Sequence, residues 1–218
     1  MHMRQKKEIE EILRRRKKTE PPEQMTDMIY SLCCVIDSLL WERDKEQRKV
    51  NIAIDGPCGG GKSTLGAVLQ EVYDCNLFHM DDFFLRVEQR TPMRYREPGG
   101  NVDYERFKAE VLDHLSDTEG IAYRRFDCGT MSMEESRRVP CNRLNIIEGS
   151  YSCHPYFGEV YALRIFVDID PDRQRERIIA RSGEGMWGRF EAEWIPMEHK
   201  YFDTFRIREK CRDVRMNL

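Results

Sequence analysis

The sequence predicts an α/β fold in which helices cover both faces of a parallel sheet. From residue 50 onward, short apolar runs alternate with segments of helical periodicity, which is the pattern of strands and helices in such folds. Glycine-rich or acidic residues directly follow several of the apolar runs. Because ligands of parallel sheets bind beyond the carboxyl ends of the strands, these residues mark the expected site.

Composition indicates an ordinary, rather polar soluble protein. The chain has 218 residues, of which 40% are hydrophobic and 34% charged, and this length suits one compact domain. A formal charge of −3 gives the whole molecule no electrostatic attraction to nucleic acid. The sequence shows no signal-peptide pattern and no run of about 18 apolar residues, so we expect neither secretion nor a membrane span. The eight cysteines form no CxxC pair and no zinc-site spacing, which favours free thiols and a cytoplasmic protein.

Residues 1–49 precede the alternating pattern, and we expect them to form a basic arm and an amphipathic helix ahead of a domain over residues 50–218. Residues 1–18 contain eight Lys or Arg and three Glu. We expect a solvated helical arm there, with contact to a polyanion or assembly of a homo-oligomer as alternatives. Apolar residues at helical spacing from Met25 to Leu40 predict a helix whose stripe packs on another element.

The remaining elements follow in chain order. Strands are expected over residues 50–55, 76–80, 144–147 and 163–169, with an edge strand over 213–218. Helices are expected over residues 62–72, from a cap at Asp103 to Leu115, from a cap at Asp170 onward, and in part of 187–201 with an interruption at Pro196. Residues 85–102 have little periodicity and are expected to form a loop or a lid-like insertion.

A glycine-rich loop follows the first strand. Its sequence, Gly-Pro-Cys-Gly-Gly-Gly-Lys-Ser-Thr, matches G-x-x-x-x-G-K-[ST], the phosphate-binding P-loop. Glycines let the backbone N–H groups converge on a phosphate, and the next helix adds the positive end of its dipole. We expect Lys62 to meet the β- and γ-phosphates and the Ser63 hydroxyl to ligate Mg²⁺. The expected cofactors are therefore ATP and Mg²⁺, held by Gly56, Pro57, Cys58, Gly59, Gly60, Gly61, Lys62, Ser63 and Thr64.

Acidic residues end the next two strands. Asp81 and Asp82 follow the second strand, and a carboxylate there can accept a hydroxyl proton during phosphate transfer. Neighbours at a strand end point to opposite sides, so we expect one of the two to face the phosphates; capping of the next turn is the alternative. Glu148 ends the third strand, where a carboxylate can hold the hydration shell of Mg²⁺, with a structural ion pair as the alternative.

Three arginines share one face of the helix that begins at Asp170. Arg173, Arg177 and Arg181 are spaced i, i+4, i+8, shortly before Gly183. Such a stripe suits a lid that closes over phosphates and neutralises the transferring charge. A solvated face paired with acidic neighbours explains it equally well.

Aromatic and polar residues near these sites are candidate substrate contacts. Phe84, Tyr123 and Phe126 can stack on a nucleobase, and core packing is the alternative. Asp103 can accept hydrogen bonds from ribose hydroxyls or act only as a helix cap. Asp82 is the remaining candidate for a substrate contact, because only one of the two neighbouring acids after the second strand is expected to accept the proton.

Several of these motifs together resemble the uridine kinase and phosphoribulokinase family. They are the P-loop, the run Asp81-Asp82-Phe83-Phe84 and Glu148-Gly149. Residues 80–85, 97–107, 126–128 and 194–196 look like a bacterial group within it that is labelled uridine kinase-like, and the resemblance spans roughly residues 50–205. It implies a P-loop NTPase fold with about five parallel strands, an ATP–magnesium site and a mobile arginine-bearing lid. It also puts the proton-accepting role on Asp81.

The resemblance has one departure, which concerns the acceptor. Uridine kinases carry a base-reading histidine shortly after a Tyr-x-Phe segment, and residues 123–130 offer none. We therefore expect an ATP-dependent phosphotransferase acting on a hydroxyl of a small molecule, with a nucleoside or ribosyl compound as first guess and no nucleic acid or membrane partner. Asp81, Lys62 and Arg177 or Arg181 would be its catalytic residues. The alternatives are an ATPase or switch that works with a protein partner, and a regulatory nucleotide binder.

Overall fold

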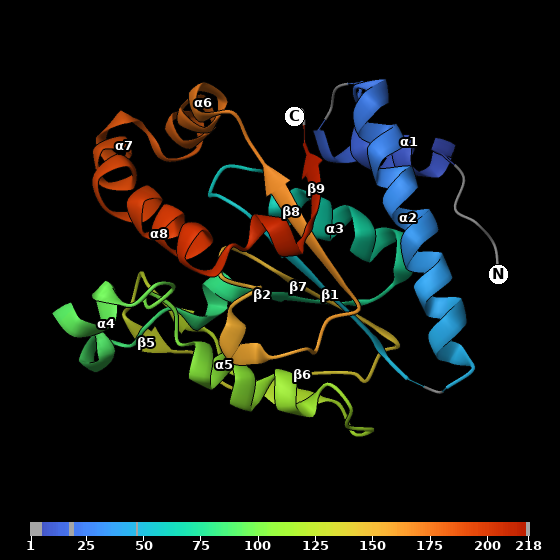
Figure 1. Ribbon diagram of the computed structural model, residues 1–218, viewed down its shortest axis with the longest axis horizontal. Helices are drawn as coiled ribbons and strands as arrows, with labels where there is room; N and C mark the ends of the chain where they lie inside the picture. Colours follow the sequence, from blue (N-terminus) through green and yellow to red (C-terminus); the bar gives the residue numbers. More distant parts are fainter. Residues whose placement is uncertain (1–5, 18–19, 47, 217–218) are drawn as a thin grey trace.

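A five-stranded parallel sheet forms the centre of the molecule (Figure 1). The computed structural model describes residues 6–17, 20–46 and 48–216. The strand order is β2, β7, β1, β8, β9, over Asn76–His79, Leu144–Glu148, Val50–Asp55, Leu163–Asp168 and Arg212–Arg215. All neighbouring pairs are parallel. The predicted α/β fold is confirmed, including the edge strand, although residues 217 and 218 of its expected range lie outside the described residues.

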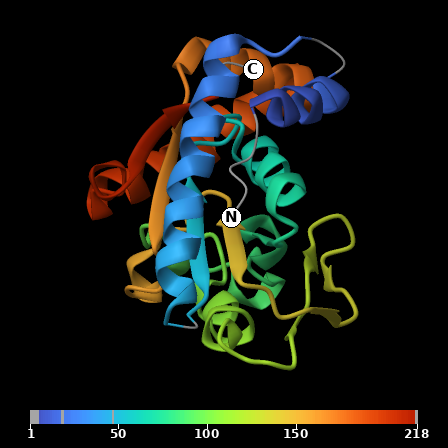
Figure 2. The same cartoon turned by 90° about the vertical axis from the view of Figure 1, so that its right-hand side faces the viewer.

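Helices cover both faces of this sheet (Figures 1 and 2). One face packs on α1 (Lys6–Lys17), α2 (Glu23–Asp44) and α3 (Lys62–Tyr73). The other packs on α5 (Tyr104–Glu110) and α8 (Ile195–Phe205). Because successive strand residues point to opposite faces, Ile52 belongs to the first apolar core and its neighbour Ala53 to the second.

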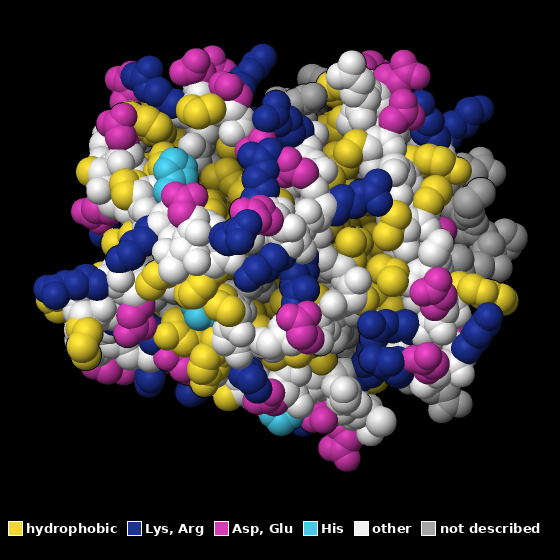
Figure 3. All heavy atoms as spheres, viewed as in Figure 1, with side chains coloured by type: hydrophobic (Ala, Val, Ile, Leu, Met, Phe, Trp, Pro, Cys, Tyr) yellow, Lys and Arg dark blue, Asp and Glu magenta, His cyan; other side chains and the backbone are white. Residues whose placement is uncertain are grey.

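The first helix is not the solvated arm that the sequence suggested. Ile9, Ile12 and Leu13 of α1 are buried in the first core, against α2 and α3. The three apolar residues are spaced i, i+3, i+4, a stripe that the surrounding basic residues obscure in the sequence. Arg16 of the same helix pairs with Glu71 of α3 at 2.6 Å. In the space-filling view, basic and acidic side chains are interspersed over the face shown (Figure 3).

Residues 85–102 form the expected irregular insertion. They contain only a short 3-10 turn (Val87–Gln89) and the five-residue helix α4 (Pro92–Arg96). Two small antiparallel sheets follow it, β3 (Ile121–Tyr123) with β6 (Arg137–Val139) and β4 (Phe126–Asp127) with β5 (Ser132–Met133). Strands of two or three residues are too short to show a period, so the sequence did not reveal them.

The segment expected to form a lid, called the lid segment below, continues from β8 through three consecutive helices. They are α6 (Pro171–Ser182), α7 (Glu184–Arg189) and α8, with a π-helical segment at Phe190–Trp194 between the last two. The expected interruption at Pro196 is wrong, since this proline lies in the first turn of α8. A proline lacks an N–H donor, and the widened π turn just before it lets the helical path continue.

Within the described residues, no helix has both the length and the apolar character required to cross a membrane.

Leu13→Ala tests whether α1 belongs to the folded core. The side chain is fully buried, so its truncation should lower the free energy of unfolding by about 2–4 kcal/mol, measured by urea denaturation. Arg15→Ala, which removes only an exposed ion pair with Glu71, is the matched control and should cost less than about 0.5 kcal/mol. Equal, small losses in both variants would mean that α1 does not contribute to the core in solution.

Candidate active site

The P-loop lies between the end of β1 and the start of α3, as the motif predicts. Gly56 has φ +134°, and a Cβ at this position would lie 2.4 Å from the carbonyl oxygen of Val167 in β8. Gly61, at the N-cap of α3, has φ +101°. Only glycine adopts these conformations without strain, so the loop curls tightly and leads directly into a helix N-terminus. This is the backbone geometry that binds a phosphate.

Lys62 is buried at the centre of the loop. Its Nζ donates to the carbonyl oxygens of Gly56 at 2.7 Å and Pro57 at 2.9 Å, and it lies 3.3 Å from Ser150 Oγ. A lysine held in this way carries a fixed positive charge beside the loop. Ser63, the next residue, is exposed and lines the same cavity.

Asp55, the last residue of β1, holds the loop in place. Its carboxylate accepts from the N–H of Gly56 at 2.7 Å, Tyr151 at 3.1 Å and Cys153 at 2.9 Å, and from the Tyr201 hydroxyl at 2.8 Å. Burial raises the pKa of Asp55 to about 6, although the hydrogen bonds from Cys153, Gly56 and Tyr201 and the charge of Lys62 oppose this rise. One carboxylate therefore connects the P-loop, the segment after β7 and α8.

Glu198 is a second buried acid at the loop. Its two carboxylate oxygens lie 3.1 and 2.9 Å from the backbone nitrogen of Cys58, and the Ser150 hydroxyl donates to it at 2.6 Å. The residue comes from α8, which follows the lid. An anionic side chain thus occupies an N–H donor of a loop that is built to bind anions.

The neighbouring acids Asp81 and Asp82 lie in a 3-10 turn after β2 and face different surroundings. Asp81 opens into the cavity that the P-loop lines. The pKa of Asp81 is raised, first by the protein that surrounds it and then by the charge of Glu148, while Lys62 opposes the rise. Asp82 is buried, with Oδ1 2.7 Å from Arg125 Nε. Asp81 is therefore the acid that can meet a ligand.

Glu148, at the end of β7, pairs with a residue that the sequence analysis did not select. Its Oε1 bonds to Nδ1 of His79, and this hydrogen bond raises the pKa of the imidazole. The Glu148 carboxylate and the Ser63 hydroxyl both line the cavity. Among the described residues, no group of three or more His, Cys, Asp or Glu could hold a metal ion. Two oxygen donors beside a phosphate loop do fit Mg²⁺, which keeps several waters and few protein ligands.

The two lid arginines have different environments. Arg177 donates to the carbonyl oxygens of Gly59 at 3.0 Å and Met216 at 2.8 Å, so it braces the P-loop against the chain after β9. Arg181, one turn later, is exposed and lines the cavity, with its guanidinium 5.7 Å from the ring centre of Phe190. Arg181 is the more available of the two for a phosphate.

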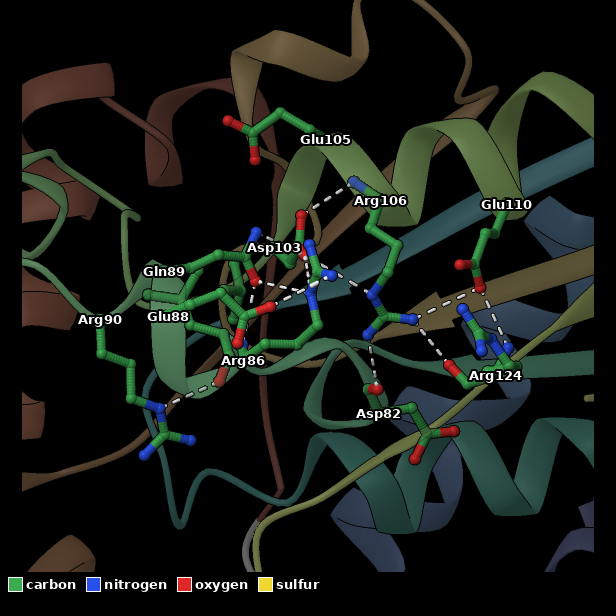
Figure 4. Close-up of polar contacts among 12 residues, drawn as sticks. Asp82, Arg86, Glu88, Gln89, Arg90, Asp103, Glu105, Arg106, Glu110 and Arg124 are labelled. Atoms are coloured by element: carbon green, nitrogen blue, oxygen red, sulfur yellow. Dashed lines mark hydrogen bonds and ion pairs between the residues drawn. The ribbon is translucent and has the colours of Figure 1, made fainter. Parts of the chain in front are cut away.

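Most of the candidate substrate contacts lie outside the cavity, and Phe84 alone among them lines it. Tyr123 and Phe126 are 3% and 5% exposed, and Tyr123 stacks on Phe83 in the second core. Asp103 caps α5 through the N–H of Arg106 and accepts from Gln89 at 2.9 Å (Figure 4). The contact of Asp82 with Arg125 could not be foreseen from local sequence, because the two residues are 43 positions apart.

The cavity has a volume of about 1100 Å³, and residues of the P-loop, of the strand ends and of the lid segment all line it. Its walls include P-loop residues, Asp81, Glu148 and Glu198 on one side. The lid contributes Arg181, Arg189 and Phe190, and the insertion after β2 contributes Leu85, Arg90, Tyr95 and Asn101. This volume exceeds what most drug-sized ligands need, so the cavity can take a nucleotide and a second small molecule together.

Similar solved structures share this fold. A candidate fructose transport system kinase from Silicibacter sp. matches with a TM-score of 0.56 and 20% identity over 77% of this chain and 88% of its own. The YGR205w protein matches with a TM-score of 0.53 and 15% identity over 83% and 86%. A possible uridine kinase from Bacillus stearothermophilus matches less closely, with a TM-score of 0.49 and 17% identity over 67% and 83%.

These matches establish the P-loop kinase fold for this chain and agree with the family resemblance noted in its motifs. No family model matches the sequence, and neither does any curated protein.

Tyr201→Phe tests the Asp55 network through its pH dependence. The pKa of Asp55 is higher in the folded protein than in the unfolded chain, so protonation of this carboxyl adds to the free energy of unfolding. This contribution is complete below the pKa of the unfolded chain and is lost as the pH rises through about 6. Removing the hydroxyl should cost about 2 kcal/mol of unfolding free energy at pH 7.5, where Asp55 is charged. At pH 4.5 the carboxyl is neutral and accepts a weaker bond, so the loss should be smaller.

The control is Tyr161→Phe, because the buried Tyr161 hydroxyl has no hydrogen-bond partner among the described residues. Denaturation curves of both variants at the two pH values give the comparison. A Tyr201→Phe loss that is the same at pH 4.5 and 7.5 would contradict the charged role of Asp55.

Glu198→Gln tests whether this carboxylate competes with a nucleotide for the loop. The charge of Glu198 also raises the pKa of Asp81, so both acids lie at the same end of the loop. We expect the variant to bind Mg²⁺-ATP roughly tenfold more tightly while ADP affinity changes little, because a like charge near the γ-phosphate is removed. Titration calorimetry measures both constants. Glu191→Gln, exposed on the same lid segment, is the control, and an unchanged ATP-to-ADP ratio in Glu198→Gln would refute the competition.

Proposed function

We propose that the protein is an ATP-dependent kinase that transfers the γ-phosphate to a hydroxyl group of a small molecule. The observation that carries this proposal is the shared cavity in which the P-loop and Lys62 face Asp81. A phosphate loop alone serves many nucleotide-binding proteins. A carboxylate that opens into the same cavity, beside the loop, adds the proton acceptor that an alcohol requires.

The nucleotide is held by the loop N–H groups and Lys62. Their positive charge and the dipole of α3 offset the charge of the triphosphate. Arg181, from the lid, can add a positive charge near the transferring group, and Arg177 keeps the loop in its curled form. Mg²⁺, held through Ser63 and Glu148, would neutralise phosphate charge when bound.

Asp81 provides the acid–base chemistry. Its raised pKa makes the carboxylate a better proton acceptor than an ordinary surface aspartate. The acceptor oxygen attacks the γ-phosphorus, its proton moves to Asp81, and ADP leaves. The lid, α6 to α8, limits access of water to this point.

The depth of the cavity supports a kinase over an ATPase that works with a protein partner. Beyond Asp81 the walls continue through Phe84, Tyr95 and Asn101, which leaves room for an acceptor larger than water. One of the structural neighbours is described as a fructose transport system kinase, which agrees with a kinase. A nucleoside or ribosyl acceptor and a cytoplasmic location remain predictions from the sequence.

Asp81→Asn tests the proposed chemistry. ADP release from Mg²⁺-ATP is first measured with nucleosides, sugars and vitamin precursors to find an accepted substrate. The variant should then lower turnover about 10²- to 10⁴-fold, because asparagine cannot accept the proton. ATP affinity should stay within about twofold, since the loop is untouched.

Thermal unfolding of the variant shows whether the fold is kept. If Asp81→Asn transfers phosphate at the normal rate, the base is another group. If ATP turnover instead depends on an added protein or nucleic acid, the switch hypothesis replaces the kinase.

A further inference from the structure

The cavity wall beyond Asp81 contains an adjacent pair of polar side chains, Tyr151 and Asn101. The hydroxyl of Tyr151 lies beside the side chain of Asn101, and Oδ1 of Asn101 is buried without a hydrogen-bond partner among the described residues. An unsatisfied buried polar atom costs about 1–3 kcal/mol, so this oxygen, next to a tyrosine hydroxyl on a cavity wall, favours a ligand that supplies hydroxyl groups.

Tyr151 is held in a strained conformation. Its φ is +77°, in the left-handed region, and its N–H donates to Asp55 at 3.1 Å. This conformation costs about 1–3 kcal/mol for a residue with a bulky side chain, and such strain is common where a side chain has a functional role. The side chain is 3% exposed. The strain and the position of the hydroxyl beside Asn101 on the cavity wall together favour a role in binding.

Asn101 approaches the reaction centre from the insertion after β2. Its neighbour Val102 pairs with Phe84 in an isolated antiparallel bridge, and Phe84 follows Asp81 by three residues. The insertion is therefore anchored beside the 3-10 turn that carries Asp81. Hydroxyls bound by Asn101 and Tyr151 would lie on the same molecule as the hydroxyl that Asp81 deprotonates.

Arg90, from the same insertion, differs from the arginines near it (Figure 4). Arg86 lies 3.3 Å from Glu88, and Arg106 lies 3.6 Å from Asp103. Arg90 instead donates Nε to the carbonyl oxygen of Leu85 at 3.0 Å, and none of its hydrogen bonds or ion pairs in the described residues involves a carboxylate.

The guanidinium of Arg90 is held on the cavity wall. It lies 5.6 Å from the ring centre of Phe126, and its Nη2 is 4.0 Å from Cys128 Sγ. The backbone bond at Nε fixes the orientation and leaves the terminal nitrogens toward other partners. A planar, fixed guanidinium in a cavity is suited to two oxygens of a carboxylate or a phosphate.

Most of the residues that the sequence suggests for recognition of a nucleobase or ribose are engaged elsewhere, and of these candidates only Phe84 lines the cavity. Tyr123 and Phe126 are buried in the protein, Asp82 is bonded to Arg125, and Asp103 to Gln89. The open polar groups of the cavity are thus hydroxyl-binding and anion-binding groups.

We propose that the acceptor is a polyhydroxylated small molecule that carries an anionic group, either a carboxylate or a phosphate. Asp81 takes the reacting hydroxyl, Asn101 and Tyr151 bond to neighbouring hydroxyls, and Arg90 binds the anion. This inference deepens the proposed kinase function and rests on it. In the transfer, the acceptor oxygen forms a bond to the γ-phosphorus, the bond from that phosphorus to the bridging oxygen of ATP breaks, and the hydroxyl proton moves to Asp81.

A set of matched acceptors tests the substrate class. Ribose, ribonic acid, ribose 5-phosphate and uridine are each offered to the full chain with Mg²⁺-ATP, and formation of the phosphorylated product is followed by mass spectrometry and ADP release. We expect kcat/KM for at least one of the two anionic acceptors to exceed that for ribose and uridine by tenfold or more. Comparison of the acid with the phosphate ester identifies which anion the site accepts. A preference for ribose or uridine would overturn the proposal.

Arg90→Gln tests the anion contact with the preferred anionic acceptor. Loss of a charge-assisted hydrogen bond should raise its KM roughly 10- to 100-fold while the KM for ATP stays unchanged, and Arg90→Lys should restore part of the affinity. Arg96→Gln, an exposed arginine of the same insertion outside the cavity, should have no effect. Tyr151→Phe should raise the KM for the acceptor and not for ATP.

The results separate this inference from the kinase proposal. If uncharged acceptors are phosphorylated as well as anionic ones, and Arg90→Gln changes nothing, the inference is wrong while the kinase proposal stands. If none of the four acceptors nor any member of the wider panel is phosphorylated, both are contradicted. An Arg90→Gln effect on ATP alone would assign Arg90 to the nucleotide.

Discussion

The buried carboxylate of Asp55 is the constraint on which the rest of the site depends. It accepts hydrogen bonds from Gly56 at the start of the P-loop, from Tyr151 and Cys153 after β7, and from Tyr201 in α8. A buried charge is costly unless it is fully hydrogen-bonded, so these donors have little freedom to move apart. The phosphate loop, the acceptor wall and the base of the lid are consequently fixed relative to one another by a single group.

Charge around Lys62 gives the site its second constraint. Asp81, Glu148 and Glu198 all line the cavity near this buried ammonium group. The carboxylate of Glu148 is hydrogen-bonded to the imidazole of His79, and the carboxylate of Glu198 accepts from the backbone N–H of Cys58 in the P-loop. A triphosphate that enters the loop brings further negative charge, so Glu198 and the helix that carries it are the parts most strongly repelled. Since α8 continues the lid, nucleotide binding and lid position are expected to be coupled.

The sheet and the phosphate loop could be predicted from sequence because their signals are local. Residues 56–64 contain a complete motif between an apolar run and a helical run, and β1, β7 and β8 each contain contiguous apolar residues, whereas the edge strand β9 is mostly charged. Glu198 could not be predicted, because its contact with Cys58 spans 140 residues and nothing adjacent to it marks a site. The burial of α1 could not be predicted from composition, because eight basic residues in the first 18 outnumber the apolar ones. The spacing of Ile9, Ile12 and Leu13 is what decides packing. The role of Asp55 could not be predicted either, because three of the donors that satisfy its carboxylate come from residues 151, 153 and 201.

The family resemblance and the cavity indicate different acceptors. The resemblance suggests a nucleoside, whereas the residues of the cavity wall favour a polyhydroxylated anion. The motifs that carry the resemblance lie mainly at the phosphate end of the cavity, and the residues that face an acceptor come largely from the irregular insertion between Leu85 and Val102. Segments of this kind change side chains without disturbing the sheet, so kinases with one fold can differ in their acceptors. In this chain the aromatic and acidic candidates for nucleoside recognition other than Phe84 are buried or ion-paired, while Arg90, Asn101 and Tyr151 line the cavity. The chemistry of the open groups is therefore a better guide to the substrate than the name of the family.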